Sequence, residues 1–130
     1  MSYTINKKIS APSFEIAVEN VTASLKEQGF GIITTIDMKA TLKNKLDVDF
    51  KPYTILGACN PKFAHKAILA EEAIGAFLPC NVLVIESKVG EYNVVAVDPV
   101  ASMMAVENEQ LPNLASDIKS MLTEAIENIN

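Results

Sequence analysis

The stretch that decides the fold is LPCNVLVIESKVGEYNVVAVDP, residues 78–99. It predicts a β-hairpin with one strand over 81–88, a turn at Val89 and Gly90, and a second strand over 92–98. Both strands are apolar at consecutive positions, as in NVLVIE and NVVAVD. Side chains of a strand alternate between the two faces of a sheet, so this pattern indicates a sheet covered on both sides, by helices or by a second subunit.

Working outward from the hairpin, strands and helices alternate along the chain. The residue patterns predict strands over 3–10, 30–37 and 53–59, and helices over 13–29, 37–46, 61–77 and 112–130, with one helical turn within 100–106. Pro61 suits a first helical turn, and Gly29 suits a helix end. We therefore expect an α+β fold, with helices packed on a single sheet of about four to five strands. The order is strand-helix-strand-helix-strand-helix-strand-strand-helix.

Length and charge limit the class of protein. The chain has 130 residues, which is the size of one domain, and a formal net charge of −5. It contains no Arg, the residue preferred for phosphate and guanine, so we expect no nucleic-acid partner. It shows no signal-type segment, membrane span or lysine cluster, so we expect a cytoplasmic protein with no membrane partner. Two cysteines in such a protein are typical of free thiols.

Cys59 and Asn60 lie where a strand meets a helix, in ILGACNPKFAHKA, residues 55–67. A thiol at a helix N-terminus is favoured as a thiolate, which suits redox chemistry, sulfur chemistry or metal ligation; a buried, inert cysteine is the alternative. Asn60 would cap the helix, or its amide would contact a ligand where backbone N–H groups hold an anion.

Cys80 lies 21 residues after Cys59, at the start of a strand. If the two strands adjoin in parallel, the thiols are a strand length apart; an antiparallel or edge arrangement brings them together. His65 would be a surface residue or the partner of Cys59 in a Cys–His pair. No spacing supports a zinc site, so we expect no metal ligand set.

Asp98 ends the hairpin before Pro99. An Asp-Pro pair at a strand end is a common turn device. The alternative is a carboxylate at the mouth of a pocket, directed toward Cys59 or Asn60. The chain contains no glycine-rich phosphate loop and no nucleophile-elbow motif.

The segments YTILGACNP, LPCNVLVIE and VVAVDP, in this order, resemble the family called domain of unknown function 302. The resemblance covers about 14–104, and the final helix at 112–130 lies beyond it. It implies a small α+β domain that is often a homodimer, and it implies no established reaction. The motif positions are Cys59, Asn60, Pro61, Pro79, Cys80, Asp98 and Pro99.

Two functions follow as hypotheses. The first is a dimeric binding module for a small anionic or thiol-reactive molecule near Cys59, Asn60 and Pro61. The second is a thiol-dependent redox, sulfur-handling or soft-metal protein that uses Cys59 with Cys80. The absence of a CxxC pair and of a clear catalytic base favours binding over catalysis. The residues identify neither a ligand nor a cofactor.

Overall fold

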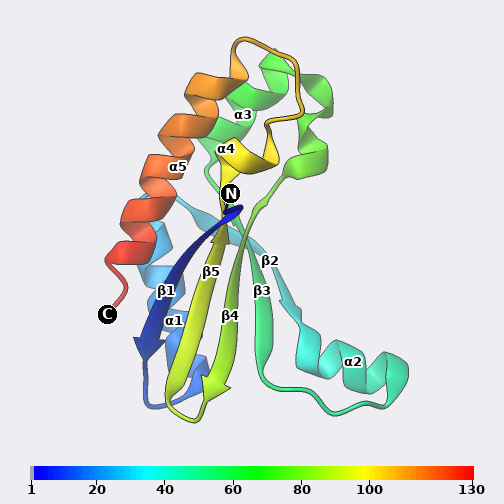
Figure 1. Cartoon of the computed structure of the whole chain (residues 1–130), viewed down its shortest axis with the longest axis vertical. Coiled ribbons are helices and arrows are strands. Elements are labelled where there is room, and N and C mark those ends of the chain that lie inside the picture. The colour runs from blue at the N-terminus through cyan, green and yellow to red at the C-terminus, as the bar shows by residue number, and fades with distance from the viewer. Residues whose placement is uncertain (1) are drawn as a thin grey trace.

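The computed structural model describes residues 2–130. Its strands are β1 (Thr4–Ser10), β2 (Gly31–Asp37), β3 (Tyr53–Cys59), β4 (Cys80–Lys88) and β5 (Glu91–Val97). Its helices are α1 (Phe14–Glu27), α2 (Met38–Leu46), α3 (Pro61–Ala70), the 3₁₀ helix η1 (Glu72–Phe77), α4 (Pro99–Ser102) and α5 (Leu111–Glu127). Figure 1 shows one sheet with helices packed on it. The predicted α+β fold and the order of elements are confirmed.

The sheet is antiparallel throughout, with strand order β1-β5-β4-β3-β2. The predicted hairpin forms β4, which is the central strand of the sheet, and β5, which lies next to it. Its register pairs Leu83 with Val95 and Val84 with Val94. Because side chains alternate along a strand, Val84 and Val94 share one face, here called the inner face, and Leu83 and Val95 share the opposite one.

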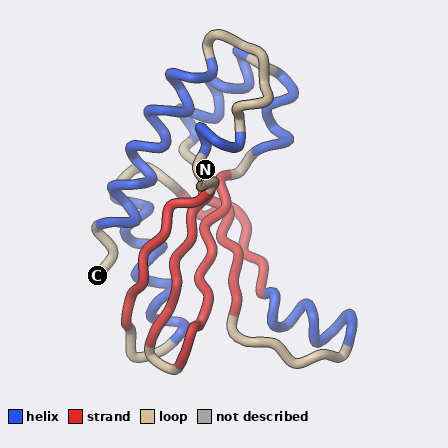
Figure 2. The backbone as a smooth tube through the Cα atoms, viewed as in Figure 1, coloured by secondary structure: helices blue, strands red, loops and turns tan. Residues whose placement is uncertain are grey.

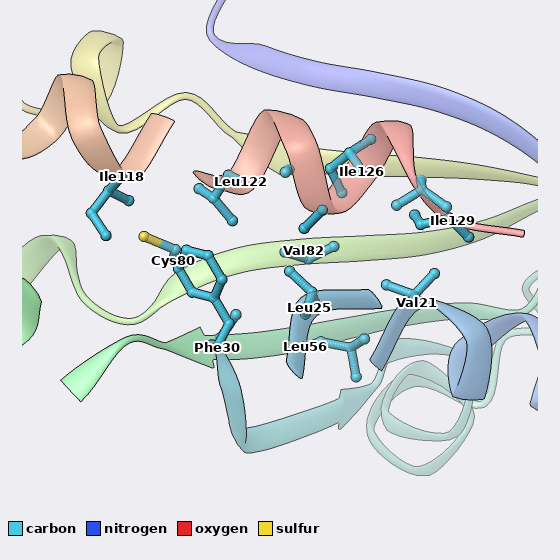
Figure 3. Close-up of a cluster of buried hydrophobic side chains, with 14 of the residues drawn as sticks. Val21, Leu25, Phe30, Leu56, Cys80, Val82, Ile118, Leu122, Ile126 and Ile129 are labelled. Carbon is cyan, nitrogen blue, oxygen red and sulfur yellow. The ribbon is translucent and has the colours of Figure 1, made fainter. Parts of the chain in front are cut away.

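Helices α1 and α5 pack on the inner face and form the core with it. Val82, Val84 and Val94 of the sheet are fully buried. Leu25 of α1 and Leu122 of α5 meet them in the cluster drawn in Figure 3. The Ser24 hydroxyl donates a hydrogen bond to the carbonyl oxygen of Ala125, which ties α1 to α5.

The opposite face of the sheet is less well covered than the sequence indicated. In Figure 1, α1 lies behind the strands and α5 lies beside β1, and no helix crosses the front of β5, β4 and β3. Leu83, Ile85 and Val95 on this face are only half-buried, whereas their neighbours on the inner face are fully buried. Within residues 2–130, helices therefore cover one face of the sheet and leave the other open.

The predicted helix over 61–77 is wrong in its second half. Helix α3 ends at Ala70, because the backbone of Glu71 is extended, with φ of −148° and ψ of 102°. The Asn108 side-chain amide donates to the carbonyl oxygen of Ala70 (2.8 Å) and to Oε1 of Glu71 (3.1 Å), which holds this end of the helix. The remaining residues form η1. Figure 2 shows these short helical segments gathered at one end of the sheet.

Gly57 of β3 lies where the sheet leaves no room for a side chain. A Cβ atom at Gly57 would lie 2.8 Å from Cγ of Pro79 and would overlap Oγ1 of Thr34. The Thr34 side chain can rotate, but the Pro79 ring is held by its backbone. We expect Gly57→Ala to lower the free energy of unfolding by about 1–3 kcal/mol, as overpacking does, in urea denaturation followed by circular dichroism.

The control is Gly75→Ala, because no atom lies within 4 Å of a Cβ built at Gly75. We expect this variant to change the free energy of unfolding by no more than about 0.5 kcal/mol, as at other open surface positions. Equal losses in the two variants would contradict the close packing of Gly57 against Pro79.

Candidate functional site

The antiparallel pairing of β3 with β4 brings the two cysteines to the same end of the sheet. Ala58 is the register partner of Cys80, and Cys59 is the next residue along β3. The pairing decides between the two arrangements that the sequence left open, because only parallel strands would separate the cysteines. Both cysteines are free thiols in this structure.

Asn60 separates β3 from α3 and forms the predicted cap. Its Oδ1 atom accepts a hydrogen bond from the backbone N–H of Phe63 (3.2 Å), and Pro61 occupies the first turn, where a missing N–H costs nothing. The strand therefore ends and the helix begins within two residues. This short junction holds Cys59 against the first turn of α3.

A cavity of about 240 Å³ opens beside this junction, between β2, the end of β3, α3 and the start of β4. Asn60 is the only residue in its lining with an amide, hydroxyl or charged side chain. Ile33 and Ile68 line the cavity and are also exposed, by 61% and 44%, so the cavity opens to solvent beside them. The lining consists of Phe30, Ile33, Ala58, Cys59, Asn60, Phe63, Ala64, Ile68, Leu78, Pro79 and Cys80.

Four of the predicted site residues therefore lie together. Cys59, Asn60, Pro79 and Cys80 all line the cavity. Pro61 and His65 lie on exposed positions of α3 and do not contribute to the lining. Of the two alternatives for His65, a surface residue or the partner of Cys59, the structure shows the surface position.

The carboxylate of Asp98 makes contacts that stabilise the fold. One carboxylate oxygen accepts from the backbone N–H groups of Val100 (2.9 Å) and Ala101 (3.3 Å), and the other lies 2.8 Å from Nζ of Lys119 on α5. Burial by itself raises the pKa of Asp98, but the hydrogen bonds from Lys119, Ala101 and Val100 outweigh burial and leave that pKa below its ordinary value. Asp98 thus caps α4, joins it to α5, and does not line the cavity.

Cys80 is the buried member of the cysteine pair. It is 4% exposed and lies between Phe30 and Ile118 in Figure 3. Burial raises the pKa of the Cys80 thiol to about 11, and the nearby Cys59 adds to the increase. At neutral pH Cys80 is therefore a protonated thiol in an apolar environment, a poor nucleophile.

The donor set of the cavity does not suit a multidentate metal site. Among residues 2–130, no three His, Cys, Asp or Glu side chains come together in a way that would hold a metal ion. In the same part of the chain, no helix has the length and apolar character needed to cross a membrane.

Seven of the eleven residues that line the cavity are ones that the sequence did not single out. Among them, Phe30 lies in the predicted strand over 30–37, and Phe63 and Ile68 lie in the predicted helix over 61–77. An apolar side chain next to a cavity and one in a filled core have the same sequence pattern, because both belong to the buried stripe of an element. The residues of the cavity wall could therefore be identified only once the positions of β2, β3, α3 and β4 relative to one another were known.

The exposure of the two thiols predicts different reactivity. We expect alkylation of the native protein at neutral to mildly alkaline pH to modify half-buried Cys59 first. Cys80 should react only on unfolding or as the pH approaches about 11, because the thiolate is the reacting form. Peptide mass spectrometry after timed labelling would measure both rates.

Cys59→Ser and Cys80→Ser variants provide the single-thiol controls for this experiment. Labelling of Cys80 in the native protein at the same rate as Cys59 would show that the Cys80 thiol is not shielded as described.

Three comparisons relate the chain to known proteins. The family described as "Domain of unknown function DUF302" matches residues 5–129. A solved structure, the uncharacterized conserved protein DUF302 from Bacillus stearothermophilus, has a TM-score of 0.90 and 24% sequence identity over 100% of both chains. No curated protein matches. The family match covers the β3–α3 junction, the β4–β5 hairpin and all of α5, and the chain belongs to the DUF302 family.

Proposed function

We propose that this protein is a homodimeric binding module that takes a small, neutral, mostly apolar molecule in the cavity beside Cys59 and Asn60. The observation that carries the proposal is the composition of the cavity wall, which is hydrocarbon, aromatic and thiol apart from Asn60. Such a wall favours a neutral ligand over the anionic one expected from the sequence, because an anion would lose its hydration without a compensating charge.

The cavity volume sets the size of the ligand. Apolar cavities of about 150 Å³ admit benzene, whereas drug-sized ligands need about 300–1,000 Å³. A cavity of about 240 Å³ therefore suits a single ring or a short branched chain. The exposed side chains of Ile33 and Ile68 at the opening would contact such a molecule as it enters.

Asn60 supplies the one amide in the lining. Its Oδ1 atom is used by the N–H of Phe63, and its Nδ2 atom has no acceptor within residues 2–130. An amide N–H that is free of protein partners would donate to a carbonyl or hydroxyl oxygen on a bound molecule. The proposed ligand class is therefore an apolar molecule with at most one or two oxygen acceptors.

A thiol-dependent function is the second candidate, and one observation favours it: both cysteines line the same cavity. The buried, protonated state of Cys80 argues against its acting as a second thiolate at neutral pH. A Cys59 labelling midpoint well below the free-thiol value of about 8.5 would favour this candidate over simple binding. The cytoplasmic location and the absence of a nucleic-acid partner stay predictions from the sequence.

Toluene is a suitable probe of the cavity, with benzoate as its anionic counterpart. We expect toluene to shift the amide NMR signals of Phe30, Cys59 and Phe63, and benzoate to shift them far less, because the wall has no charged group. Ala64→Leu would place additional carbon atoms in the cavity, so we expect it to weaken toluene binding at least about tenfold, or by about 1.4 kcal/mol.

The matched control is Ala23→Leu on an exposed position of α1, which leaves the cavity unchanged. Shifts that follow benzoate instead of toluene, or toluene binding that survives Ala64→Leu, would overturn the proposed ligand class.

A further inference from the structure

The cavity beside the β3–α3 junction contains a nucleophile as well as an apolar wall. Cys59 and Cys80 both line it, and they differ in what can reach them. Cys59 is half-buried in a cavity that opens to solvent, whereas Cys80 is 4% exposed and packs into the core. Burial raises the pKa of the Cys80 thiol to about 11, so at neutral pH Cys59 is the nucleophile of the pair.

No amine, imidazole or carboxylate competes with this thiol inside the cavity. Apart from the two cysteines and Asn60, the lining is hydrocarbon or aromatic, and an amide is not a nucleophile. Lys62, His65 and Lys66 lie on exposed positions of α3 and are not among the lining residues. A molecule inside the cavity would therefore meet one accessible nucleophile.

A hydrogen-bond donor follows this thiol in the chain. Asn60 uses Oδ1 to accept from the N–H of Phe63 (3.2 Å), which fixes the position of its amide nitrogen, Nδ2. A Cβ atom built at Gly29 would lie 3.3 Å from Nδ2, so the glycine leaves space beside that nitrogen. The φ of Gly29 is +86°, which disfavours any side chain at this position. The amide nitrogen is therefore uncovered on this side and can donate to an oxygen atom of a ligand.

We propose that Cys59 captures small, neutral α,β-unsaturated ketones or aldehydes in this cavity, by addition of its thiol to their carbon–carbon double bond. The inference rests on the proposed binding function and narrows its ligand to an electrophile. A single ring or short chain with one carbonyl oxygen matches both the volume of about 240 Å³ and the one amide of the lining. Its lack of charge matches a wall without charged side chains.

The addition needs no oxidant, reductant or leaving group. The Cys59 thiol loses its proton to water, and its sulfur forms a bond to the β-carbon while the carbon–carbon π bond breaks. The π electron pair moves toward the carbonyl oxygen, where the Asn60 amide would donate a hydrogen bond to the developing negative charge. Water returns one proton to the α-carbon. The product is a thioether that contains every atom of the thiol and of the ligand.

The test uses 2-cyclohexen-1-one, a single ring with one carbonyl oxygen, at neutral pH, with adducts followed by intact-protein and peptide mass spectrometry. We expect one molecule to add, on Cys59, at a rate that saturates with concentration because the ligand binds before it reacts. Glutathione is the reference thiol. At low concentration of the ring, we expect Cys59 to react at least about tenfold faster than glutathione, because the cavity holds the double bond beside the sulfur.

Two variants test the amide and the cavity separately. Asn60→Asp keeps an oxygen that caps α3 but has no N–H donor, so we expect the rate of addition to fall at least about tenfold. Ala64→Leu fills the cavity, and we expect it to remove the saturation. The matched control, Ala23→Leu on α1, should react as the wild type does. Circular dichroism establishes that each variant is folded.

Competition by cyclohexanone, the saturated ring, needs no variant and keeps the proposal testable if Ala64→Leu or Asn60→Asp fails to fold. We expect cyclohexanone to slow the addition to Cys59 and to leave the reaction of glutathione unchanged. A rate that does not exceed that of glutathione, or one that cyclohexanone does not lower, would overturn the proposal.

Toluene binding separates this inference from the proposed function. A protein that shows the toluene-induced shifts but does not capture cyclohexenone would keep the ligand site and reject the electrophile. A protein that does neither would reject both. Capture without toluene binding would support the inference and show that the ligand requires the contact with the Asn60 amide.

Discussion

The antiparallel register between β3 and β4 is the constraint on which the candidate site depends. It sets Ala58 opposite Cys80, so the end of one strand and the start of the next lie side by side. The chain must then leave β3 and return to β4 at the same end of the sheet, and α3 and η1 fill that return. The cavity forms where α3 packs over the strand ends with space left between them.

The same register explains why Cys80 is buried while Cys59 is only half-buried. Side chains alternate along a strand, so Cys80 joins Ala58 on the inner face while Cys59 continues into the turn. Cys80 is thereby enclosed by the core of Phe30 and Ile118, which raises the pKa of its thiol, and Cys59 stays half-buried beside Asn60. Two residues that look equivalent in the sequence have different chemical environments because of this alternation.

Local residue patterns predicted most of the fold, and long-range packing determined the rest. The β-branched residues and Gly90 predicted the hairpin, and Asn60 followed by Pro61 predicted the start of α3. The sequence pattern did not predict the break after Ala70, where the Asn108 side chain, 38 positions away, donates a hydrogen bond to the Ala70 carbonyl oxygen. Cys59, Asn60, Pro79 and Cys80 were site candidates from the sequence, which left open whether the two cysteines meet. Phe30, Phe63 and Ile68 became part of the wall only once the elements were packed.

Asp98 shows how a motif position is explained by stability alone. Its carboxylate caps α4 and binds Lys119, so α4 is fixed against α5 at the end of the sheet that carries the cavity. On the face of the sheet opposite α1 and α5, Leu83, Ile85 and Val95 stay half-buried, because no helix of residues 2–130 covers them.

The most direct test of the central claim, an apolar cavity at the paired ends of β3 and β4, is a crystal structure of the protein under xenon pressure. Xenon occupies empty apolar cavities and is excluded from hydrated ones. We expect a xenon atom among Phe30, Phe63 and Cys80. Ordered water molecules at that position, with xenon bound only elsewhere, would contradict the claim and with it the proposed ligand class.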